Sequence, residues 1–223
     1  MPPLELAGPT GPLEALLEEP SGSRSVGTDG LVQAGRVDGL RAAVVLAHPH
    51  TEYGGTMHTK ALYHAAKALL RIGCAVLRFN FRGAGRSAGA FSGGPGELQD
   101  FSVALDVMQS RYPEARLWAG GMSFGAWVAM AAGAIDTRVS TLIGLSVPIT
   151  GYDLASVQTS SKAKFFIHGE RDELFPLRDV REFYARAAEP KELVVIDGAD
   201  HLFDGRAGEV GDAVEDLLGD WQG

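Results

Sequence analysis

Near the middle of the chain the residues read Gly121-Met122-Ser123-Phe124-Gly125, between an apolar run over 116–120 and small residues over 126–132. The apolar run is typical of a buried strand, and the small residues are typical of a helix packed on a sheet. A serine between glycines at such a junction indicates a nucleophile elbow, a strained turn that raises the hydroxyl above the sheet end. Glycine is needed where the residues two before and two after the serine meet. An ordinary strand-to-helix turn is the alternative.

Two later segments supply the partners that a nucleophilic serine needs. One apolar run ends in His168-Gly169-Glu170-Arg171-Asp172, and another is followed by Asp197-Gly198-Ala199-Asp200-His201. Loops that follow parallel strands emerge at the same edge of a sheet, so Ser123, Asp172 and His201 are predicted to converge there. In this interpretation His201 removes the Ser123 proton, and Asp172 fixes the imidazole tautomer and stabilises the imidazolium.

Each partner also has a simpler interpretation. Asp172 could cap a helix that begins near Pro176. The neighbouring carboxylates Glu170 and Glu173 could take its place beside the histidine. His201 could be a solvated loop histidine.

Attack by a serine creates an oxyanion, which needs backbone donors. The first predicted donor is the N–H of Phe124, the residue after the nucleophile. The second is expected from the loop His48-Pro49-His50-Thr51-Glu52-Tyr53-Gly54-Gly55 after the strand 42–47, with His50 as the first choice and Thr51 as the next. His48, His50 and His58 could instead bind a metal, but a serine mechanism needs none, so we expect no metal site.

These phrases, in their order, resemble the α/β-hydrolase superfamily, and more narrowly the small lidless bacterial hydrolases and carboxylesterases related to dienelactone hydrolases. The resemblance covers roughly residues 4–220 and rests on the elbow and on the segments 47–58, 77–87, 168–172 and 198–201. It implies an α/β fold with an eight-stranded, mostly parallel sheet, helices on both faces, and a Ser123–Asp172–His201 triad. The segment from about 150 to 163 is too short for a cap domain.

We therefore expect a single domain over 1–223, with terminal tails at 1–3 and 221–223. A Gly/Ser-rich connection over 20–40 is longer than this subgroup leads us to expect. Before it, strands over 4–6 and 13–17 should form a hairpin at the sheet edge. Helices are expected over about 57–72, around 177–188 and from about 209, and another is expected whose apolar stripe begins at Leu98 and ends near Pro113.

Composition narrows the function classes. The chain has 223 residues, 45% of them hydrophobic, which suits one sizeable α/β core. Its net charge of −8 makes nucleic acid an unexpected partner. No apolar run approaches the length of a membrane span, and the N-terminus has no signal-peptide pattern, so we expect a cytoplasmic protein. Base rates alone suggest a homodimer.

A second glycine-rich motif could indicate a different function, the binding of a dinucleotide. Residues 83–88 match a dinucleotide-binding fingerprint, but glycines and a proline follow where that fingerprint requires a helix. In the same segment, Arg82 and Arg86 could hold an anionic group of a substrate. They could equally tie loops together.

Taken together, the sequence predicts a serine hydrolase that cleaves short-chain carboxylic esters through an acyl-enzyme, without a cofactor. Predicted substrate contacts are Thr51, Tyr53, Arg86 and Tyr152, and further candidates for the pocket wall are Met57, Phe91 and Trp127. A thioesterase, a lactonase or a small peptidase would use the same elbow. A binding or scaffold protein without turnover is the alternative from a different class.

Overall fold

The computed structural model describes residues 4–21 and 39–221. The expected tail at 1–3 and most of the expected connection over 20–40 lie outside these residues. Trp221, which the sequence assigns to a tail, packs against Phe165 with ring centroids 5.4 Å apart, and its Nε1 donates to Thr141 Oγ1 at 3.4 Å.

Eight strands form one sheet in the order β1-β2-β4-β3-β5-β6-β7-β8. Their bounds are β1 Leu4–Gly8, β2 Gly11–Glu18, β3 Ala42–Ala47, β4 Ala75–Phe79, β5 Arg116–Met122, β6 Val139–Leu145, β7 Ala163–Gly169 and β8 Lys191–Ile196. Strands β3 to β8 are parallel, and the hairpin β1–β2 joins antiparallel through β4. The expected eight-stranded, mostly parallel sheet with an edge hairpin is confirmed.

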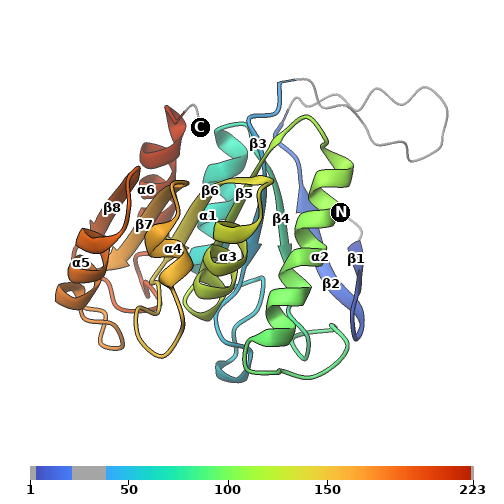
Figure 1. Ribbon diagram of the computed structural model, residues 1–223, viewed down its shortest axis with the longest axis horizontal. Coiled ribbons are helices and arrows are strands. Elements are labelled where there is room, and N and C mark those ends of the chain that lie inside the picture. The colour runs from blue at the N-terminus through green and yellow to red at the C-terminus, as the bar shows by residue number, and fades with distance from the viewer. Residues whose placement is uncertain (1–3, 22–38, 222–223) are drawn as a thin grey trace.

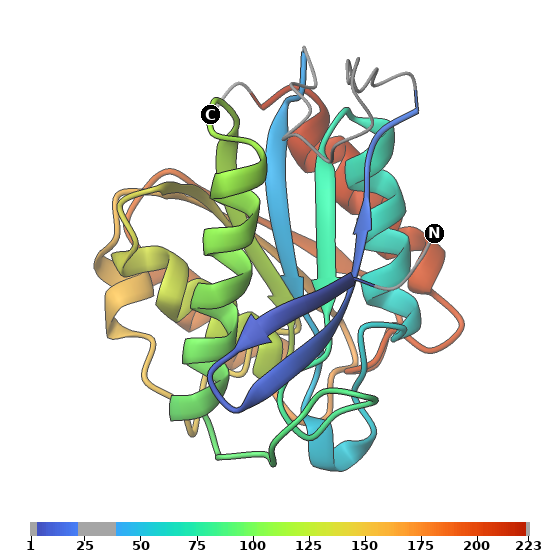
Figure 2. The ribbon, with the colours of Figure 1, turned by 90° about the vertical axis from the view of Figure 1, so that its right-hand side faces the viewer.

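Helices cover both faces of the sheet. Their bounds are η1 Thr51–Tyr53 (a 3-10 turn), α1 Lys60–Arg71, α2 Pro95–Arg111, α3 Phe124–Ile135, α4 Ala155–Thr159, α5 Leu177–Arg186 and α6 Ala207–Gly219. Figure 1 shows α2 to α5 in front of the sheet and α1 and α6 behind it. In Figure 2 the sheet is seen from its β1 edge, with α2 on one side and α1 and α6 on the other.

The sheet needs both helical layers because its central strands are apolar on both faces. In β3 every side chain is buried. Ala43, Val45 and Ala47 join the core under α2 and α3, whereas the alternate residues join the core under α1 and α6. Such continuous apolar runs are characteristic of parallel strands that are buried on both sides.

The strand order places the site. From β3 the chain moves outward to β4 and then returns to β5, on the other side of β3. The loops after β3 and β5 therefore start at neighbouring strand ends, as the pairing of Ala47 with Gly121 shows. Ligands of open α/β sheets bind outside such a switch point.

Two connections bear on the expectations from sequence. Between β6 and β7 the chain forms only the five-residue helix α4, so there is no cap domain among the described residues. Residues 83–94 form turns and bends before α2, so no helix follows the glycines of 83–88 as a dinucleotide site would require. Among the described residues, every helix is too short or too polar to traverse a lipid bilayer.

A buried ion pair ties the loop after β4 to α2. The Arg82 guanidinium donates from Nε and Nη2 to the two carboxylate oxygens of Asp100, at 2.9 and 2.7 Å, and both side chains are buried. Asp100 also accepts the N–H of Arg82 at 3.0 Å. Arg82 is therefore a loop tie, the second of the two interpretations that its sequence position allowed.

Removing one partner of this pair should be costly. Asp100→Ala is expected to lower the free energy of unfolding by about 3–5 kcal/mol, because it leaves a buried guanidinium uncompensated. Asp106→Ala is the matched control on the same helix, since the Asp106–Arg138 pair is largely exposed and should contribute less than about 1 kcal/mol. Urea unfolding of both variants measures the difference, and equal losses would contradict the assignment.

Candidate active site

The elbow around Ser123 has the strained backbone that the sequence predicts. Ser123 lies between β5 and α3 with φ 52° and ψ −123°, and its N–H donates to Leu145 O at 2.8 Å. A Cβ added at Gly121 would lie 2.3 Å from Gly125 O, and one added at Gly125 would lie 2.3 Å from His48 O. Both glycines are therefore required by the close approach of backbone to backbone.

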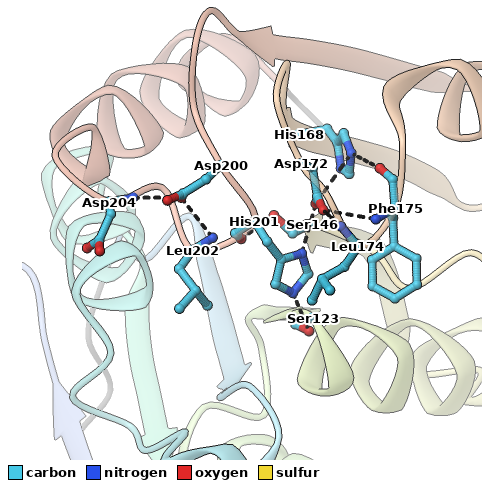
Figure 3. Close-up of polar contacts among 10 residues, drawn as sticks. All are labelled: Ser123, Ser146, His168, Asp172, Leu174, Phe175, Asp200, His201, Leu202 and Asp204. Atoms are coloured by element: carbon cyan, nitrogen blue, oxygen red, sulfur yellow. Dashed lines mark hydrogen bonds and ion pairs between the residues drawn. The ribbon is translucent and has the colours of Figure 1, made fainter.

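The structure brings Ser123, His201 and Asp172 into one hydrogen-bonded line (Figure 3). His201 Nε2 lies 2.8 Å from Ser123 Oγ, and His201 Nδ1 lies 2.8 Å from Asp172 Oδ2. An ionised carboxylate can only accept, so Nδ1 carries the proton and Nε2 is the acceptor for the Ser123 hydroxyl. This arrangement can move the serine proton to the imidazole.

Asp172 is held in the turn between β7 and α5. Its Oδ1 accepts the N–H groups of Leu174 and Phe175, both at 2.9 Å. Burial alone would raise the pKa of Asp172, but the hydrogen bonds from His201 and Phe175 outweigh it and hold the pKa below its usual value. Asp172 is thus a carboxylate facing the imidazole.

The competing acids have other roles. The residue that caps α5 is Pro176, so Asp172 shapes the turn without capping the helix. Glu170 is exposed and accepts the Gly198 N–H at 2.8 Å, which joins the Asp172 and His201 loops. Glu173 is exposed as well.

His168 supports the Asp172 turn, a role that the sequence did not reveal. It is buried at the end of β7, and its Nε2 donates to Phe175 O at 2.8 Å. Burial lowers its pKa, so the ring is neutral, and its buried Nδ1 has no partner among the described residues. The ring of Phe175 in turn contacts that of His201, with centroids 5.5 Å apart. His168 thereby fixes the residue that holds both Asp172 and His201.

Ser146 supports His201 from the end of β6. Its Oγ donates to His201 O at 2.9 Å, its N–H donates to Ile167 O, and the side chain is fully buried. Its φ is 46°, in the left-handed region that a non-glycine residue rarely adopts. In the described part of the chain only Ser123, Ser146 and Phe203 are non-glycine residues with positive φ, and Phe203 lies two residues after His201.

The two residues predicted to supply the oxyanion donors, Phe124 and His50, contact one another through their rings. Phe124 is the first residue of α3, where an N–H has no partner inside the helix. His50 precedes η1, and its ring lies 5.1 Å from that of Phe124. His50 O accepts the N–H groups of Tyr53 and Gly55, whereas its own N–H donates to no acceptor within the described residues.

His48 is structural. Its Nδ1 donates to Pro49 O at 2.6 Å, and its Nε2 accepts the Phe81 N–H at 3.0 Å. Both ring nitrogens are therefore occupied, and burial lowers its pKa to about 4. Over the ranges that the structure describes, no three His, Cys, Asp or Glu side chains gather as metal ligands. His48 instead ties the loop after β3 to the loop after β4.

The predicted substrate contacts divide into two groups. Tyr53 and Tyr152 belong to the same set of touching rings as His50 and Phe124. Thr51 lies beside them, and its buried Oγ1 has no hydrogen-bond partner among the described residues. Arg86 is tied to Glu14 instead: its Nε donates to Oε1, and its N–H to Oε2, both at 2.9 Å.

Comparisons with known proteins relate the chain to serine hydrolases. Residues 38–164 match the family described as serine aminopeptidase, S33. An uncharacterized protein of Rickettsia prowazekii (strain Madrid E) is 34% identical over 202 residues, covering 82% of this chain and 84% of that protein. An alpha-beta serine hydrolase homologue from Coxiella burnetii is 30% identical with a TM-score of 0.85, over 97% of this chain and 96% of that one. XC6422 from Xanthomonas campestris, an a/b serine hydrolase without lid, is 30% identical with a TM-score of 0.81. The match covers 96% of this chain and 91% of that one.

Replacing Ser146 tests its two roles separately. Ser146→Ala keeps the left-handed strain that serine already bears and leaves His201 O unpaired, so the free energy of unfolding should fall by about 1–3 kcal/mol. Ser146→Gly loses the same hydrogen bond but relieves that strain, so its free energy of unfolding should be about 1–2 kcal/mol higher than that of the alanine variant. Urea unfolding measures both, and an alanine variant more stable than the glycine variant would contradict the positive φ at this residue.

His48 should make stability pH-dependent. The unfolded chain binds a proton on His48 with the ordinary pKa of 6.5, whereas the folded chain does so only near pH 4. The folded state therefore loses stability as pH falls from 6.5 towards 4, by about 2 kcal/mol at about pH 5. His48→Gln should remove this share of the pH dependence in urea unfolding, and His58→Gln, at an exposed position, should retain it. An unchanged slope in His48→Gln would refute the assignment.

Proposed function

Because the chain belongs to the serine aminopeptidase S33 family and has the α/β-hydrolase fold, we propose that it cleaves short-chain carboxylic esters through an acyl-enzyme on Ser123. The observation that carries the proposal is the continuous line of two 2.8 Å hydrogen bonds from Ser123 through His201 to Asp172. The narrower kinship with dienelactone hydrolases belongs to the same proposal and rests on residues 47–58 and 77–87.

In the first half of the reaction Ser123 Oγ forms a bond to the ester carbonyl carbon while its proton moves to His201 Nε2. The carbonyl oxygen becomes an oxyanion in a tetrahedral intermediate. The carbon–oxygen bond to the alcohol then breaks, and His201 gives its proton to the leaving oxygen. The products of this half are the free alcohol and an acyl group on Ser123.

In the second half water takes the place of the serine. His201 removes a proton from water as the water oxygen bonds to the acyl carbon. The bond from that carbon to Ser123 Oγ breaks, and the proton returns to Oγ, releasing the carboxylic acid. Asp172 stays ionised throughout, as the depressed pKa of its carboxyl requires, and stabilises the imidazolium of each half.

Stabilisation of the oxyanion is assigned to the N–H groups of Phe124 and His50. Phe124 N–H stands at the start of α3, where the helix dipole adds to its effect. One such donor typically contributes about 2.7–4 kcal/mol to transition-state stabilisation. The tie between His48 and Phe81 holds the loop that carries His50 in place before substrate arrives.

An ester fits the surroundings of Ser123 better than an aminopeptidase substrate. A peptide with a free N-terminus brings an α-ammonium group close to the scissile bond, which calls for a carboxylate nearby. The side chains around Phe124 are rings instead: His50, Phe81, Phe91, Trp127 and Tyr152. The absence of a cap between β6 and β7 also suits a freely approached site.

A fluorophosphonate probe tests the proposal. Wild type should gain one adduct by intact mass, and Ser123→Ala should gain none, because only an activated serine reacts. A panel of 4-nitrophenyl esters of increasing acyl length should then be hydrolysed by wild type, fastest for short chains. Asp172→Asn should lower kcat by about 10⁴-fold, because the imidazole loses its correct tautomer.

A folded wild-type protein that takes up no adduct would refute an activated Ser123 and favour a binding protein without turnover. Labelling combined with faster cleavage of thioesters, lactones or aminoacyl amides than of esters would keep the nucleophile and replace the substrate.

A further inference from the structure

Six aromatic side chains form a continuous group beside Ser123, which we call the ring cluster: His50, Tyr53, Phe91, Phe124, Trp127 and Tyr152. Phe124, the residue after the nucleophile, is its centre, with centroids of four other rings 5.1 to 5.9 Å away. His50 continues the cluster to Tyr53 and Phe91 at 4.7 and 4.4 Å, and Trp127 contacts Tyr152 at 4.6 Å.

The ring cluster has a buried floor and an accessible wall. Phe124 and Trp127 are buried, whereas His50, Phe91 and Tyr152 are half-buried and Tyr53 is 87% exposed. The wall residues come from three separate loops, after β3, β4 and β6. Rings that served only to fill the core would not leave their outer members accessible to solvent.

Hydroxyl groups border the wall. Burial raises the pKa of Tyr152, and the nearby Tyr53 hydroxyl raises it further, because two phenolate charges repel. Tyr53 and Tyr152 come from different loops and are joined through the rings of His50 and Phe124. Thr51 Oγ1, buried beside them, has no hydrogen-bond partner among the described residues. The hydroxyls of the exposed Tyr53 and the half-buried Tyr152 can thus offer polar contacts to a substituent on a bound ring.

The position of the ring cluster indicates which half of an ester it contacts. The leaving oxygen must face His201 Nε2, and His201 follows β8 on one side of Ser123. The loops after β3 and β4, which carry His50, Tyr53 and Phe91, lie on the other side. The acyl group, which remains attached to Ser123, therefore faces the rings of His50, Tyr53 and Phe91. Tyr152 follows β6 and joins this group through its contact with Phe124, with centroids 5.9 Å apart.

The His201 side is different in character. Leu174 and Leu202 follow Asp172 and His201 in the chain, and Figure 3 shows them among the residues around this pair. Their exposed fractions are 60% and 52%. They offer an aliphatic surface to the alcohol. The two halves of the substrate would therefore meet different chemistry, rings on one side and aliphatic chains on the other.

We propose that the ring cluster is the acyl-binding surface and that the preferred substrates are esters of aryl or arylalkanoic acids. This inference rests on the proposed serine-hydrolase function. Stacked and edge-to-face aromatic pairs contribute free energy beyond that of apolar burial, so a ring on the acyl group should be distinguished from a saturated group of similar size.

Two substrates isolate that effect: methyl 3-phenylpropanoate and methyl 3-cyclohexylpropanoate, which share the alcohol and the chain length. For wild type we expect kcat/KM to be about three- to tenfold higher for the phenyl ester. Apolar burial alone predicts no preference for the phenyl ester, because the cyclohexyl group is at least as hydrophobic.

Two variants remove one ring each while keeping apolar bulk. Tyr152→Leu and Phe91→Leu should each reduce the phenyl-to-cyclohexyl ratio towards one, and using both guards against one failing to fold. Tyr63→Leu is the control, because Tyr63 is an exposed aromatic residue on α1 that contacts His64 and lies outside the ring cluster. The phenyl-to-cyclohexyl ratio of this variant should equal that of wild type.

Labelling of wild type by the fluorophosphonate probe separates the two proposals. A labelled enzyme that hydrolyses both esters with a ratio near one would overturn the acyl preference and leave the serine hydrolase intact. A preference that persists in both ring variants would also overturn the role of the ring cluster. A folded wild type without an adduct would overturn both proposals together.

Discussion

Backbone packed directly on backbone at Gly125 is the constraint on which the site depends. A Cβ there would lie 2.3 Å from His48 O, so only glycine lets α3 begin against the loop after β3. That contact sets Phe124 beside His50, the two residues predicted to supply the oxyanion donors. Gly121 meets Gly125 in the same way and allows the turn to lift Ser123. The proposed chemistry therefore requires that residues 121 and 125 have no Cβ.

Strain at the site is balanced by hydrogen bonds from neighbouring strands. Ser123 and Ser146, both with positive φ, donate their N–H groups to Leu145 O and Ile167 O. Each unfavourable conformation costs about 1–3 kcal/mol and persists only where surrounding structure determines it. The sheet holds these two conformations in place, because its strand ends cannot shift without disturbing the apolar cores on both faces.

The sequence predicts the sheet and the convergence at its edge because apolar runs and glycine turns are local signals. It could not reveal Ser146 or His168, whose roles depend on contacts with His201 and Phe175 made only in the folded chain. Arg86 shows the same limit: Glu14, its partner, is 72 positions away. Trp221 falls within the predicted tail 221–223, yet its ring contacts that of Phe165 on β7.

The unlike flanks of Ser123 have a stereochemical consequence. Aromatic rings lie on the side of the loops after β3 and β4, and exposed leucines follow Asp172 and His201. Under the proposed binding of the acyl group to the rings, Ser123 would attack the ester carbonyl from one face. If the ring cluster binds the acyl group as proposed, and the carbon next to that carbonyl is a stereocentre, the two enantiomers present their rings to Phe91 differently while the leaving oxygen faces His201. The fold thereby acts as a chiral environment, in which a racemic ester would be resolved into its two hands.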